Sequence, residues 1–268
     1  MRWAAAGAAL GALLALVALA PAAWVAAAVA DAVAGASEQR LLLADARGTV
    51  WAGSAVPVLT GGAGSRDASA LPGRLHWRLG FDGSALALRA SHACCLNGEL
   101  HLRVRPGWGG ARVELQPAAA TAGQAAPIGQ WPAAWLVGLG TPWNTLQPSG
   151  SIRLMSPGLV AESVKGRWLL DGRAEIELDS MASRISTLDE LGSYRLVLQG
   201  DGAGGEAASL QLSTLRGALQ LSGSGQWSAS KLRFQGQASA AEGSEAALNN
   251  LLNIIGRRQG ALSVISIG

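Results

Sequence analysis

The residues best suited to chemistry in this sequence are His92, Cys94 and Cys95, which lie within four positions. Imidazole and thiolate are ligands that zinc prefers, yet a structural zinc site takes four ligands at characteristic spacings. One histidine and two adjacent cysteines fall short of that set. We therefore expect no metal and no cofactor.

Cys94 and Cys95 have two readings. In an oxidising compartment they could form a vicinal disulfide, but neighbouring residues seldom meet disulfide geometry. On a strand their side chains would also point to opposite faces. We favour an unlinked structural pair and keep the vicinal disulfide as the alternative.

The other polar candidates do not form a catalytic arrangement. His76 and His101 alternate with leucine and tryptophan, which is typical of solvated positions on a half-buried strand. Glu175, Glu177 and Asp179 share one strand face. A solvated face is expected there, with calcium binding or acid–base chemistry as a remote alternative. The sequence therefore predicts a protein that is not an enzyme.

Composition excludes further classes. Charged residues make up 15% of the chain, its formal net charge is +3, and its basic residues form no block, so a nucleic-acid surface is not expected. Apolar residues make up 49%, which excludes extended disorder. The glycine clusters at 61–64 and 200–205 lack the Lys-Ser/Thr of a phosphate loop and open no helix.

Trp131, Trp135 and Trp143 crowd thirteen positions together with Pro132 and Pro142. Tryptophan is enriched at binding hot spots, so the cluster could be a partner-binding patch. The same residues would also suit a small core beneath an open sheet, because buried aromatics dominate core energetics. We favour the core, and name residues 131–146 as the segment most suited to meet a partner.

Most of the chain after residue 39 alternates apolar and polar residues with a period of two, the pattern of half-buried strands. Gly-Gly and Asx-Gly pairs suited to tight turns separate the strands. The pattern predicts a mainly β protein with a strongly curved, open antiparallel sheet, a half-barrel or groove, and one or two short helices. Its apolar inner face should carry Leu75, Trp77, Leu100, Leu102, Leu196, Leu198, Leu219 and Leu221.

Two segments break this alternation. Residues 131–138 have proline one place inside a short apolar run, which fits a first helical turn. Residues 244–255 read as a helix capped by Ser244 and stopped by Gly256, with an apolar stripe including Leu248 and Leu252. A last strand is expected over 261–267. Residues 117–130, rich in Ala, Pro, Gly and Gln, are the candidate linker.

No charged residue stands between Arg2 and Asp31. This uncharged stretch is long enough for a membrane span. We expect a transmembrane anchor over 1–30 that Pro21 kinks or ends, a juxtamembrane linker over 31–38 and a periplasmic β-rich domain over 39–268. The charge flanking the span favours a cytoplasmic amino end. The alternative is a cleaved signal peptide, with Ala-x-Ala triplets near Ala20 and Ala30.

Four segments carry a resemblance to a known family: ADARGTVWAG at 44–53, LGTPWNTL at 139–146, LDELGSYRL at 188–196 and LNNLLNIIGRRQG at 248–260. In their order, after an apolar amino-terminal segment, they resemble the type II secretion system protein N family, also called general secretion pathway protein N. The resemblance runs over nearly the whole chain.

The resemblance implies a single-pass inner-membrane protein of a Gram-negative bacterium with a periplasmic domain. It implies a non-enzymatic accessory role in exporting folded proteins across the outer membrane. The implied partners are other inner-membrane platform components or the outer-membrane secretin, with membrane contact through residues 3–30. An alternative function is that of an AsmA-like carrier holding lipid or another hydrophobic ligand in a β-groove, if helices leave the alternating leucines uncovered.

Overall fold

The computed structural model describes residues 2–34, 40–62, 64–107, 110–117, 124–164, 167–202, 208–228 and 231–268. Its helices are α1 (Arg2–Ala18), α2 (Ala23–Ala34), the 3₁₀ helix η1 (Ala133–Leu139), α3 (Trp143–Leu146) and α4 (Glu245–Ile255). Its strands are β1 (Arg40–Gly48), β2 (Ala52–Thr60), β3 (Ala68–Ala70), β4 (Leu75–Asp82), β5 (Ala85–His92), β6 (Glu99–Gly107), β7 (Gly110–Pro117), β8 (Ala126–Pro132), β9 (Pro148–Val164), β10 (Arg167–Ser183), β11 (Gly192–Asp201), β12 (Ala208–Arg216), β13 (Leu219–Ser228), β14 (Lys231–Ala240), β15 (Arg257–Gln259) and β16 (Leu262–Ile267).

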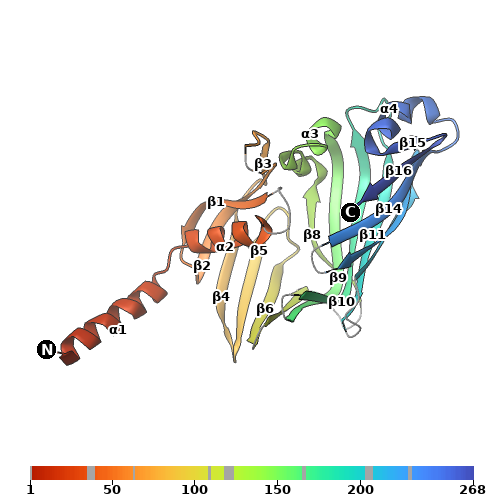
Figure 1. The fold of residues 1–268 in the computed structure, drawn as a ribbon. Coiled ribbons are helices and arrows are strands. Elements are labelled where there is room, and N and C mark those ends of the chain that lie inside the picture. Colours follow the sequence, from red (N-terminus) through yellow and green to blue (C-terminus); the bar gives the residue numbers. More distant parts are fainter. Residues whose placement is uncertain are drawn as a thin grey trace.

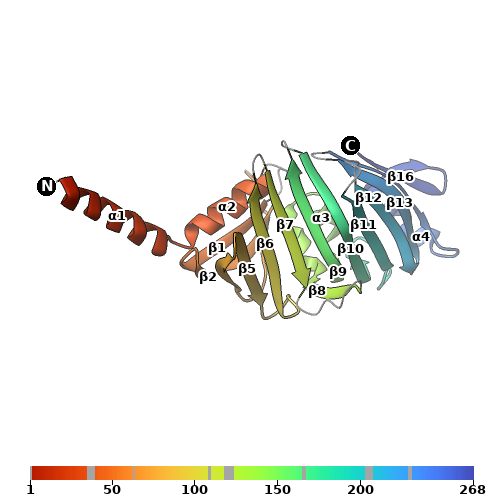
Figure 2. The same cartoon turned by 90° about the horizontal axis from the view of Figure 1, so that it is seen from below.

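All of these strands join one antiparallel sheet, and most neighbours in the sheet are neighbours in the chain (Figures 1 and 2). The hydrogen-bonded path of strands runs from β1 to β15. Strands β3 and β8 lie off this path, where β3 pairs with β2 and β8 pairs with β9. In Figure 1 the sheet curves so that β1–β6 and β9–β16 lie on either side of α3. The predicted mainly β class, with an open antiparallel sheet, is confirmed.

The strand register divides the sheet into two faces. Leu102 stands opposite Leu88 on one neighbouring strand and opposite Leu115 on the other. Across the sheet, Leu196 likewise stands between Ile176 and Leu212. Because side chains alternate along a strand, these leucines share one face, called here the apolar face. The opposite face carries most of the arginines of the strands and is called the polar face.

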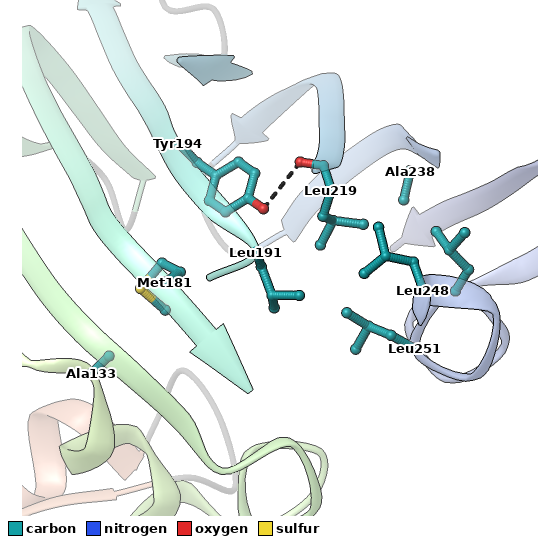
Figure 3. Packing of buried hydrophobic residues seen from close by; sticks show 9 residues of the cluster. Ala133, Met181, Leu191, Tyr194, Leu219, Ala238, Leu248 and Leu251 are labelled. Atoms are coloured by element: carbon teal, nitrogen blue, oxygen red, sulfur yellow. Dashed lines mark hydrogen bonds between the residues drawn. The ribbon is translucent and has the colours of Figure 1, made fainter. Parts of the chain in front are cut away.

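Helices cover the apolar face at its two ends. Near β1, Ala22 and residues of α2 pack against Leu43, Ala55 and Trp77. At the far end, Leu248, Leu251 and Leu252 of α4 pack in a cluster with Leu219 (Figure 3). This second cluster also holds Tyr194, whose hydroxyl donates a hydrogen bond of 3.1 Å to the Leu219 carbonyl (Figure 3).

The segment expected to form the anchor, which Pro21 was expected to kink or end, is folded as two helices, α1 and α2. The break lies at Pro21, which has no N–H to donate and pushes the preceding residue toward an extended conformation. The Ala20 carbonyl accepts a hydrogen bond from the Val50 N–H, and the Ala22 N–H donates to the Gly48 carbonyl. These bonds join the break to the connection between β1 and β2. None of the helices in the described ranges has the length and apolarity needed to span a membrane.

The predicted helix near the carboxyl end is present as α4, although the Ser244 side chain makes no capping hydrogen bond. Gly256 ends it in an extended conformation, and Arg257 begins the short strand β15 rather than a helical last turn. The predicted helical turn after Trp131 is the 3₁₀ helix η1. Part of the candidate linker over 117–130 is the strand β8, and residues 118–123 lie outside the described ranges.

Candidate functional site

The tryptophan-rich segment 131–146 connects β8 to β9 and touches both halves of the curved sheet. On one side, β8 pairs with β9, where Trp131 stands opposite Ile152. On the other, β8 meets the connection between β5 and β6, because the Gln130 N–H donates to the Cys95 carbonyl at 3.0 Å. The segment therefore lies where strands distant in the chain come together.

Trp131 is half-buried at the end of β8. Its ring lies over Gly129, where an added Cβ would come within 2.8 Å of the ring. A side chain at position 129 would therefore push the indole away from this place.

Trp135 attaches η1 to β3, in the half of the curved sheet that begins with β1. Its Nε1–H donates a hydrogen bond of 3.0 Å to the carbonyl of Ser69 in β3. Gly138, three residues later, is buried, and an added Cβ would lie 2.6 Å from the Ser69 backbone nitrogen. The close approach of η1 to β3 thus requires glycine at position 138.

Trp143 opens the short helix α3 and is half-buried. The next residue, Asn144, donates to a carboxylate oxygen of Asp67 at 3.0 Å. At the other end of α3, the Leu146 carbonyl accepts a bond of 2.5 Å from the Ser183 hydroxyl in β10. Residues 141–146 therefore link the segment before β3 to β10.

The three tryptophans lie on three different elements. Within the described ranges the one pair of stacked or tilted aromatic rings is Trp51 with Phe81, so the predicted cluster does not stack on itself. Each of the three indoles combines a part packed on the protein with a part open to solvent. That arrangement can contribute to both stability and recognition.

Cys94 and Cys95 lie in the turn after β5, where backbone direction no longer forces their side chains apart, and a disulfide joins them. Ligand atoms of His92, Cys94 and Cys95 all lie within 4.8 Å of one another. Metals bind the thiolate form of cysteine, which a disulfide does not offer.

His92 is the functional candidate whose environment the sequence analysis did not anticipate. It is 3% exposed on the apolar face, and neither ring nitrogen has a hydrogen-bond partner within the described structure. Burial, assisted by the charge of His76, lowers the pKa of His92 below its usual 6.5. The sequence feature that could have predicted this burial is the alternation of Leu86, Leu88 and Ala90, which puts position 92 on the apolar face.

The carboxylates of β10 are paired with arginines on the polar face. Glu175 and Glu177 both contact Arg195, at 2.6 and 2.8 Å, and Asp179 lies 3.4 Å from Arg216. The hydrogen bond to Glu177 raises the pKa of Arg195. Carboxylates engaged in this way form an ion-pair ladder across the sheet. The side chains of Glu175 and Glu177 are only 12% and 16% exposed, so they are more covered than the expected solvated face implies.

Comparison with known proteins gives one result that bears on these features. The family model described as type II secretion system (T2SS), protein N, matches residues 39–264. No curated protein and no solved structure matches the chain.

Proposed function

This chain belongs to the type II secretion system protein N family, and from that premise we propose that it is a non-enzymatic binding or assembly module of the secretion machinery. The family is an accessory component of type II secretion. The observation that carries the proposal is the match over residues 39–264, which takes in nearly the whole sheet. In this proposal the domain after α2 lies in the periplasm and contacts inner-membrane platform components or the outer-membrane secretin.

We further propose that residues 3–30 attach the protein to the inner membrane, with the amino end in the cytoplasm. The apolar side chains of α1 are open to solvent, with Leu13, Leu14 and Leu16 each more than half exposed. Helix α1 also projects away from the sheet (Figure 1). Exposed apolar surface of this kind is favourable in contact with lipid or protein.

Reporter fusions after residue 60, together with sequencing of the mature amino end, test the attachment and its direction. A periplasmic reporter should be active on a chain that retains Arg2. A mature chain that starts near Asp31, or a reporter active only in the cytoplasm, would contradict this part of the proposal.

We propose that Trp135 and Trp143 contact the secretion partner with their solvent-open edges. The test places a photoreactive phenylalanine derivative at either position of the full chain in secreting cells, and identifies the crosslinked proteins. The matched control is position 226, where Gln226 is exposed on the polar face of β13. Crosslinks to secretion components from 135 or 143 but not from 226 would support the contact.

Substitution separates recognition from folding at the same positions. An interface role predicts that Trp143→Ala keeps the melting temperature near wild type while copurification with the partner weakens. A purely structural role predicts a loss of about 3–5 kcal/mol in the free energy of unfolding. If no crosslinks form and the alanine variants unfold readily, these residues do not belong to the partner contact and this part of the proposal fails.

A carrier of lipid or another hydrophobic ligand is the second candidate. It is favoured by the apolar face between the two helical covers, where Leu88, Leu102 and Leu115 are only half-buried. Mass spectrometry of the protein after mild purification tests this role. Stoichiometric lipid would favour a carrier, and lipid-free protein that still supports secretion would favour the assembly module.

A further inference from the structure

Two rows of side chains cross the polar face of β2, β4, β5 and β6 next to each other. In one row Arg78 stands opposite Arg89, and Arg89 stands opposite His101. Like charges directly opposite each other on neighbouring strands destabilise a sheet.

Several other arginines on the polar face have carboxylate partners. Arg103 contacts Asp82, and Arg112 lies 3.0 Å from Glu114. Within the described ranges, neither Arg78 nor Arg89 forms an ion pair or a hydrogen bond through its side chain. Both are exposed, so each keeps all of its guanidinium donors available to a ligand.

The two arginines border a hollow of about 590 Å³ on the polar face. The second row also lines this hollow, with His76 opposite Ser91 and Ser91 opposite Glu99. Arg47 completes the rim, and its guanidinium lies 2.7 Å from Asp45. Among the described residues that line the hollow, Glu99 is the one with a carboxylate, and it lies 3.5 Å from a ring nitrogen of His101.

We propose that this hollow binds a phosphate group, with Arg78 and Arg89 as its principal ligands. The planar guanidinium presents N–H donors that match the oxygens of a phosphate in pairs. The Ser91 hydroxyl and the His76 ring provide additional polar contacts from the neighbouring row. A bound phosphate would also remove the repulsion between the two arginines.

The position of the hollow favours a lipid headgroup as the source of this phosphate. Arg47, Gly48 and Ala52 line the hollow and flank the connection between β1 and β2. In that connection, the indole N–H of Trp51 donates a bond of 2.8 Å to the Val17 carbonyl near the end of α1. The hollow therefore lies beside the exposed apolar helix that we propose to attach the protein to the membrane.

The distribution of charged residues along the chain also favours an anionic ligand in this part of the sheet. Residues 40–107 contain eight arginines and four acidic residues, whereas residues 110–216 contain eight basic and ten acidic ones. A local excess of one sign attracts ligands of the opposite sign. The part of the sheet next to α1 is thus the part suited to an anionic ligand.

Calorimetric titration of the full chain in neutral detergent, at low salt, tests the site. The two probes are inorganic phosphate and glycerophosphoglycerol, the water-soluble headgroup of an anionic phospholipid. The test variant is Arg78→Gln with Arg89→Gln. The control is Arg257→Gln with Arg258→Gln, which removes the same charge at the other end of the sheet.

We expect the test variant to bind at least tenfold more weakly than wild type and the control variant to stay within twofold. Tighter binding of glycerophosphoglycerol would support the site with a lipid as its source, and tighter binding of inorganic phosphate would support it with a soluble source. Failure of both probes to bind, or equal binding by the test variant, would overturn the proposal.

The melting temperature of the test variant serves as the folding control. Because the substitution removes like-charge repulsion, it should not fall below the wild-type value. If the double variant does not fold, Arg89→Gln alone should still weaken binding at least threefold, and unchanged binding by this single variant would equally overturn the site.

Discussion

At the scale of single residues, burial without partners distinguishes His92. The apolar face encloses an imidazole whose two nitrogens make no hydrogen bond within the described structure. A buried polar group in this state is costly, and the cost grows when the group is charged. His92 is therefore held neutral in the folded protein, as its lowered pKa indicates.

This environment predicts a pH dependence of stability. The unfolded chain takes up a proton at His92 near pH 6.5, whereas the folded protein resists protonation to lower pH. The free energy of unfolding should therefore fall as the pH drops from about 6.5 through the lowered pKa of His92, by at most about 1.4 kcal/mol per pH unit from this group. Urea unfolding followed by tryptophan fluorescence between pH 5 and 8 measures it.

Two variants isolate the contribution of His92. The change His92→Leu removes the titrating group and should flatten the dependence between pH 6.5 and 5. The change His101→Gln, which replaces a histidine of the polar face, is the matched control. An equally steep fall in the His92→Leu variant would show that other groups cause it.

The neighbouring cysteines give a second prediction at this scale. The disulfide between Cys94 and Cys95 is expected to form if the domain lies in an oxidising compartment, as we propose. Alkylation of the denatured protein without reductant, followed by mass spectrometry, should add no label. Two labels per chain would indicate free thiols and would return His92, Cys94 and Cys95 to consideration as ligands.

At the scale of elements, the helices differ in what they pack against. Helix α1 exposes its leucines, while α2 buries part of its surface on β1 and α4 buries one face on the carboxyl end of the sheet. In α4, Leu248 is fully buried, whereas Ile254 on the other side is 43% exposed. The amphipathic pattern of α4 thus matches its one-sided contact with the sheet.

This contrast predicts the effects of truncating side chains in α4. The change Leu248→Ala should lower the free energy of unfolding by about 2–5 kcal/mol, because it leaves a cavity under the helix. The change Ile254→Ala removes a partly exposed side chain and introduces a better helix former, so it should alter stability by less than about 1 kcal/mol. Denaturant unfolding measures both, and equal losses would show that α4 does not dock through Leu248.

At the scale of the whole molecule, one sheet with two chemically different faces organises everything else. The helices gather on the apolar face, and the ion pairs run along the polar face. Long sheets with open edges curve and twist, and here the segment 131–146 lies on the inside of the curve, between the two halves of the sheet (Figure 1). The candidate binding features accordingly fall on different surfaces, with the tryptophans on the inner side and the arginine pair on the polar face.

The division into faces predicts opposite outcomes for adjacent substitutions. The change Leu102→Asp puts a charge among apolar neighbours and should cost at least about 2 kcal/mol in the free energy of unfolding. The change Arg103→Asp loses the contact with Asp82 on the polar face and should cost about 1 kcal/mol or less. Equal losses of folded domain in the two variants would mean that the faces are wrongly assigned.

The sequence by itself determined the local features. Alternation around Trp77, Leu102 and Leu196 predicted the strands and the apolar face, and Pro21 marked where the first helix ends. These patterns can be recognised in the sequence because the period of a strand or helix depends on chain geometry over only a few residues.

The tertiary structure decided the features that join distant segments. Only the register of β4 with β5 brings Arg78 opposite Arg89, and only the curvature of the sheet carries Trp135 to Ser69, 66 residues away. The sequence also did not show that the turn after β5, which holds Cys95, meets β8. Contacts of this kind depend on how strands align and how far the sheet bends, and these follow from packing over the whole molecule rather than from any local pattern.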